Sequence, residues 1–86
     1  MQLEELRLIT ASNIIKLRTG AGMTQAGLGQ RLNYSDKSIS KWERGEAIPD
    51  AFVLTQMAEL FGVTVEDLYC LKENRELEDR QYEDLQ

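Results

Sequence analysis

The fold of this 86-residue chain can be inferred from one stretch of its sequence, MTQAGLGQRLNYSDKSISKWERG, which spans residues 23–45. Thr24 is a good N-cap, so the positions after it predict a helix over about residues 25–32. Ser35 is a second N-cap and predicts a helix that runs to about residue 44. Asn33, between the two, belongs to a residue type that tolerates the left-handed backbone conformation. The stretch therefore predicts two short helices joined by a tight turn.

The rest of the chain predicts three more helices. Apolar residues at helical spacing favour a helix over about residues 10–20, which Gly20 and Gly22 end. Asp50 caps a fourth helix that ends at Gly62, and Thr64 with Asp67 three residues later caps a fifth. We expect an all-α protein, a compact five-helix bundle with a central helix-turn-helix. Its predicted parts are an N-terminal lead-in over residues 1–9, the helix-turn-helix domain over residues 10–71 and a charged C-terminal extension over residues 72–86.

The formal charge of −5 is unevenly distributed along the chain. Residues 10–49 carry six basic and three acidic side chains, a net charge of +3. Residues 50–86 carry a net charge of −7. Because the positive charge is concentrated around the two central helices, the acidic total does not exclude a nucleic-acid contact there.

Composition argues against several other classes of protein. The chain has no histidine and a single cysteine, Cys70, so neither a disulfide framework nor a metal cluster is expected. No Gly-rich phosphate loop precedes a helix, and we expect neither enzymatic activity nor a cofactor. No run approaches the roughly 20 apolar residues that span a bilayer, so no membrane partner is expected. The charged N-terminus does not resemble a signal peptide, and we expect a cytoplasmic protein.

The second central helix begins with small polar and basic residues, which is typical of a helix-turn-helix DNA-binding protein. In that arrangement the second helix enters the major groove and the first crosses the DNA backbone. From Ile14 to Leu71 the chain resembles the lambda-repressor-like helix-turn-helix family, of the Cro and XRE type. The matching residues are Leu17-Arg18, Thr24-Gln25, Leu28, ISKWERG at 39–45, Pro49, Leu54, Met57-Ala58, LFGVT at 60–64 and Asp67-Leu68. The resemblance implies a five-helix domain that usually binds DNA as a two-fold dimer.

The chain departs from the family pattern in its first central helix and in the turn. Gly27 and Gly29 lie where the family more often has a charged residue and an alanine, and each glycine is expected to cost about 1 kcal/mol relative to alanine. Asn33 and Tyr34 replace a glycine and a small aliphatic residue in the turn. We expect Asn33 to serve in the turn and Tyr34 to be partly exposed.

The resemblance places the DNA contacts on the two central helices. Asp36, Lys37 and Lys41 occupy the positions that face base edges, where lysine donates to guanine and aspartate accepts from cytosine. For Asp36, an interaction with the helix dipole is the slightly favoured alternative. Thr24 and Gln25 are expected at a phosphate, with capping alone as the alternative. The remaining expected DNA contacts are Ser35, Ser38, Ser40 and Arg44.

Two further residues are expected to have a structural role. By resemblance, Arg18 and Glu43 form an ion pair that ties the second central helix to the bundle. Trp42 is expected in the core and not on DNA.

We therefore predict a sequence-specific transcriptional regulator that binds double-stranded DNA as a homodimer. Repression is the expected effect, and activation is the alternative that the sequence leaves open. The predicted dimer surface consists of Tyr69, Leu71, Leu77, Tyr82 and Leu85. The alternative is a protein-interaction module on the same fold, such as an antitoxin or adaptor whose partner is a protein and whose DNA binding is weak or lost. The acidic residues 50–86 and the two glycines of the first central helix keep that alternative open.

Overall fold

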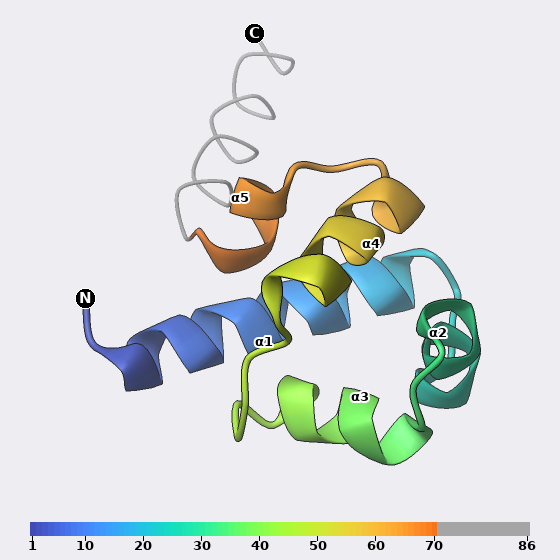
Figure 1. Ribbon diagram of the computed structural model, residues 1–86, viewed down its shortest axis with the longest axis horizontal. Coiled ribbons are helices and arrows are strands. Elements are labelled where there is room, and N and C mark those ends of the chain that lie inside the picture. Colours follow the sequence, from blue (N-terminus) through green and yellow to red (C-terminus); the bar gives the residue numbers. More distant parts are fainter. Residues whose placement is uncertain (71–86) are drawn as a thin grey trace, which may run out of the picture.

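The computed structural model describes residues 1–70, which form five α-helices and no strand (Figure 1). The helices are α1 (Leu3–Gly20), α2 (Gln25–Leu32), α3 (Asp36–Glu43), α4 (Ala51–Phe61) and α5 (Val65–Tyr69). The expected all-α fold is confirmed. The predicted extension over residues 72–86, and with it most of the predicted dimer surface, lies outside the described residues.

α1 is longer than the sequence pattern indicated. It runs without a break from Leu3, so the lead-in and the first helix form one helix of 18 residues. The carboxylates of Glu4 and Glu5 in its first turn stabilise the N-terminus of the helix, because they lie at the positive end of the helix dipole. The start was hard to place because this end of the helix has a poor apolar stripe: Leu3 and Leu8 are both 58% exposed.

The predicted caps set the ends of the other helices. The Thr24 hydroxyl accepts from the Gly27 amide at 2.9 Å, and the Asp50 carboxylate accepts from the Val53 amide at 2.9 Å. Thr64 and Asp67 form the complete capping box of α5. Asn33 ends α2 with φ = 62°, the left-handed conformation expected of the turn. These local signals explain why the predicted bounds of α2 to α5 agree closely with the observed ones.

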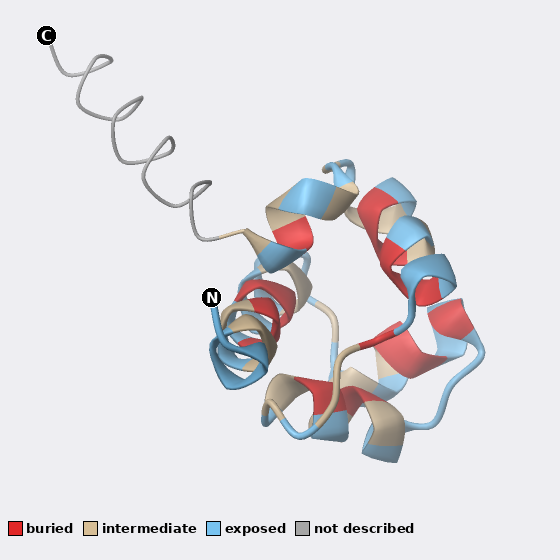
Figure 2. Ribbon diagram, turned by 60° about the vertical axis from the view of Figure 1, so that its left-hand side comes forward, coloured by how far each residue is buried: buried red, intermediate tan, exposed pale blue. Residues whose placement is uncertain are grey.

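The core draws on every helix. Figure 2 shows the buried positions of the helices turned toward the interior of the bundle. One fully buried side chain comes from each helix in turn: Ile14, Leu28, Ile39, Met57 and Leu68. Trp42 joins this cluster at 8% exposure, so its expected place in the core is confirmed. α3 is thereby held to the bundle by one apolar face.

The turn between α2 and α3 corrects the expectation for Gly29. A β-carbon at this position would lie 2.5 Å from the carbonyl oxygen of Tyr34, a distance that requires the backbone to shift. Glycine is therefore required there by the close approach of two backbone segments, whatever its lower helix propensity. Tyr34 itself is 41% exposed and packs edge-on against Trp42, with ring centroids 5.1 Å apart.

Candidate nucleic-acid interface

The exposed face of α3 carries most of the residues expected to contact DNA. Asp36, Lys37, Lys41 and Arg44 are exposed, whereas the opposite face of the helix is buried in the core. A hollow of about 500 Å³ lies along this exposed face and is called the α3 hollow here. It is lined by Gln25, Asp36, Lys37, Ser40, Lys41, Arg44 and Glu46. The structure thus brings together residues from α2, α3 and the following turn.

Thr24, Ser35 and Ser38 do not line the α3 hollow and contribute at the helix N-termini. Thr24 caps α2, as described above, and the hydroxyl of Ser35 accepts from the Ser38 amide at 3.3 Å to cap α3. Both capping residues are exposed. The N-termini of α2 and α3, which favour negative charge through their free N–H groups and dipoles, are therefore open to solvent.

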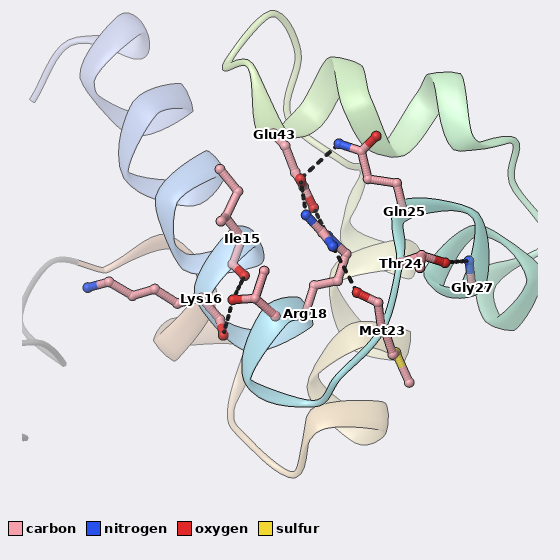
Figure 3. A network of polar contacts seen from close by, with 9 residues as sticks. Ile15, Lys16, Arg18, Met23, Thr24, Gln25, Gly27 and Glu43 are labelled. Atoms are coloured by element: carbon pink, nitrogen blue, oxygen red, sulfur yellow. Dashed lines mark hydrogen bonds and ion pairs between the residues drawn. The ribbon is translucent and has the colours of Figure 1, made fainter.

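Arg18 and Glu43 form the ion pair that the resemblance implied (Figure 3). The Nε and Nη2 atoms of Arg18 donate to the two carboxylate oxygens of Glu43, at 2.5 and 2.9 Å. Their side chains are only 14% and 5% exposed, so water screens the pair weakly. The hydrogen bond to Glu43 raises the pKa of the Arg18 guanidinium above its usual value.

The ion pair extends into a network that fixes where α2 begins relative to α3. Nη1 of Arg18 donates to the carbonyl oxygen of Met23 at 2.8 Å, in the turn before α2. Nε2 of Gln25 donates to Oε1 of Glu43 at 3.0 Å, and Figure 3 shows its amide on the side of the carboxylate opposite Met23. The sequence pattern predicted Gln25 only as a phosphate contact. Its bond to Glu43 was not predicted because it depends on how α2 and α3 pack, across 18 residues of sequence.

Arg44 and Glu46 form a second, exposed ion pair on the rim of the α3 hollow. Nη2 of Arg44 donates to Oε2 of Glu46 at 2.9 Å, and Nη1 donates to the Ser40 hydroxyl. The hydrogen bond with Arg44 lowers the pKa of Glu46 below its usual range, and the same bond raises that of Arg44. Sequence reasoning counted Glu46 only as one acidic residue of this segment. The signal in the sequence was the glycine before it, Gly45, which can end a helix by turning the chain back. In the structure Gly45 has φ = 74°, and Glu46 returns toward α3.

The comparison with protein families agrees with this geometry. The family model described as helix-turn-helix matches residues 14–68. The chain belongs to the Cro/C1-type helix-turn-helix family. The match covers all of α2 to α4, the C-terminal part of α1 from residue 14 and all of α5 but its last residue, and it includes every residue that lines the α3 hollow.

Two relatives of this helix-turn-helix protein are named as regulators of transcription. The chain is 40% identical over 53 residues to the HTH-type transcriptional activator BcrR of Enterococcus faecalis. The matched segment covers 62% of the chain and 26% of BcrR. The chain is 32% identical over 60 residues to the uncharacterized HTH-type transcriptional regulator y4dJ of Sinorhizobium fredii, 70% of the chain and 78% of y4dJ. The chain thus spans about a quarter of the length of BcrR and most of that of y4dJ.

Two crystal structures show the same fold. The hypothetical transcription factor NHTF from Neisseria aligns with a TM-score of 0.75 at 23% identity, over 90% of both chains. The clp gene regulator ClgR from Corynebacterium glutamicum aligns with a TM-score of 0.71 at 22% identity, over 93% of this chain and 85% of ClgR. Within residues 1–70, no helix is both long and apolar enough to cross a membrane.

Proposed function

We propose that this helix-turn-helix protein is a sequence-specific DNA-binding regulator of transcription that inserts α3 into the major groove. One observation carries the proposal: α3 has a buried apolar face, and on its opposite side Lys37, Lys41 and the C-cap residue Arg44 line one open hollow. A helix anchored in this way presents its polar face rigidly. Such a face is what contact with base edges requires.

The proposed contacts divide into two groups. Asp36, Lys37 and Lys41 lie toward base edges, as their place on the exposed face of α3 allows. Gln25, Ser40 and Arg44 lie toward the backbone, together with the N-termini capped by Thr24 and Ser35. Ser38 belongs to this second group through its place in the first turn of α3. Phosphate contacts supply most of the affinity and make it depend steeply on salt.

A two-fold homodimer is part of the proposal. Two copies would contact half-sites about 34–36 Å apart, or a multiple of that distance, because each α3 must reach the same side of the duplex. Within the described residues, Tyr69 of the predicted dimer surface is 40% exposed at the end of α5. Repression stays a prediction, with activation as the alternative, and the relative BcrR is named as an activator.

The proposal is tested by removing positive charge from the α3 hollow. The variant Lys37→Ala/Lys41→Ala is expected to bind a mixed-sequence duplex at least about tenfold more weakly at low salt, because two cationic contacts are lost. The measurement is fluorescence anisotropy of a labelled duplex, with circular dichroism to establish that the variant is folded.

The matched control is Arg31→Ala, which removes one positive charge from a different surface. Arg31 is exposed on α2 and lines a separate hollow with Leu32, Gln56, Glu59 and Leu60. Its removal is expected to change binding less than about twofold. If the folded double variant bound DNA as tightly as the unmodified chain does, α3 would not be the helix that contacts DNA and this proposal would be wrong. If the unmodified chain itself bound no duplex, the interaction-module alternative would replace the proposal.

A further inference from the structure

The turn after α3 places an acidic side chain against the most C-terminal cation of the α3 hollow. Arg44 is the C-cap residue of α3, and its guanidinium donates to Glu46 and to Ser40. Gly45 adopts φ = 74°, and the amide of Glu46 donates to the carbonyl oxygen of Lys41 at 3.1 Å. Backbone geometry therefore holds Glu46 beside Arg44.

The pair lies inside the proposed DNA interface and is open to solvent. Arg44 and Glu46 both line the α3 hollow with Lys37 and Lys41, and their side chains are 56% and 51% exposed. An exposed ion pair of this kind is weakly held, since water screens both charges. Another anion that approaches the hollow can therefore take the place of Glu46.

The chemistry of the guanidinium makes a DNA phosphate such an anion. Its planar fork of N–H donors binds carboxylate and phosphate oxygens with the same geometry. Glu46 thus occupies the Nη2 donor of Arg44 that a phosphate oxygen would otherwise accept from. Once displaced, its carboxylate would remain close to the phosphate and repel it.

We propose that Glu46 is an intramolecular competitor of the DNA backbone for Arg44, and that it limits the affinity of this chain for DNA of any sequence. The inference rests on the proposed function, because it assumes that α3 faces DNA. As a consequence, phosphate contacts supply a smaller share of the total affinity for DNA than they would if Arg44 had no competing carboxylate. The contacts of Asp36 and Lys37 with base edges then supply a larger share of it.

A double-mutant cycle tests the competition. The unmodified chain, Glu46→Gln, Arg44→Gln and the double variant are titrated with one mixed-sequence duplex over a salt series, using fluorescence anisotropy. Glu46→Gln is expected to bind about three- to tenfold more tightly at low salt, with a salt dependence steeper by about one released counterion. In the Arg44→Gln background the same change is expected to gain less than about twofold, because the contested guanidinium is gone.

Glu66→Gln is the matched control, since Glu66 is exposed on α5 and outside the α3 hollow. It makes the same change in net charge and is expected to leave affinity unaltered. An equal gain from Glu46→Gln with and without Arg44 would overturn the inference in favour of simple repulsion between a carboxylate and DNA. No gain in either background would overturn it as well. An unmodified chain that binds no duplex would overturn the inference together with the proposed function.

Discussion

Glu43 receives hydrogen bonds from two different helices in a nearly buried position. Its carboxylate accepts from Arg18 of α1 and from Gln25 of α2, while it ends α3 itself. Removing a partner from a buried ion pair leaves the other charge uncompensated. Glu43 thus links the three helices on which the candidate interface depends.

We therefore expect Glu43→Ala to lower the free energy of unfolding by about 3 kcal/mol, since Arg18 would remain mostly buried without its partner. Chemical denaturation followed by circular dichroism measures this loss. The control Glu66→Ala removes an exposed carboxylate and is expected to change stability by less than about 0.5 kcal/mol. A loss at Glu43 below about 1 kcal/mol would contradict the structural role assigned to the pair.

Gly29 gives a second prediction at the scale of one residue. Gly29→Ala is expected to destabilise the fold by about 1–3 kcal/mol, because the new methyl group would press on the backbone of Tyr34. Gly20→Ala is the matched control, because nothing lies within 4 Å of a β-carbon built there. Helix propensity then favours alanine by up to about 1 kcal/mol. Thermal unfolding of both variants measures the difference, and a stabilised Gly29→Ala would show that the turn can relax.

Among the elements, α5 is short and is held to α1 by a buried polar contact. The side-chain amide of Asn13 donates to the carbonyl oxygen of Leu68 at 3.0 Å, and Asn13 is 4% exposed. Leu68 fills the core beside this bond with no exposed surface. Packing and one hydrogen bond together fix α5 on the bundle.

We expect Asn13→Ala to cost about 1–3 kcal/mol of unfolding free energy, because the Leu68 carbonyl would lose its donor in a buried place. Amide hydrogen exchange is expected to show the greatest loss of protection in α5. Ser12→Ala, at an exposed position one residue away, is the control and should leave that protection intact. Uniform loss of protection in all five helices would mean that α5 does not open separately.

The sequence predicted most of the elements because their signals are local. Caps at Thr24, Asp50 and Thr64 act within three residues, so a pattern in the chain is enough to find them. The start of α1 was missed because its exposed leucines give no clear apolar stripe. Contacts between helices were harder to predict. The Arg18–Glu43 pair was predicted from family resemblance, and the hydrogen bond from Gln25 to Glu43 was not predicted, because it depends on how α2 and α3 pack.

At the scale of the whole molecule, the distribution of charge matters more than its sum. The chain carries −5 overall, yet Lys37, Lys41 and Arg44 gather on one surface of α3. The fold separates this surface from acidic residues of α4 and α5 such as Glu59 and Glu66. Asp36 and Glu46 also line the hollow, and Glu46 is the one that pairs with Arg44. The positive segment could be found from the sequence, whereas the pairing of Glu46 with Arg44 could be found only from the structure.

The central claim is that α3 recognises a particular DNA sequence. It is tested most directly by selecting bound sequences from a random duplex pool at low and at moderate salt. We expect an enriched inverted repeat whose half-sites lie about one helical turn apart, or a multiple of it, and whose enrichment survives moderate salt. A folded chain that enriches no sequence at either salt would contradict sequence-specific binding and favour a protein partner.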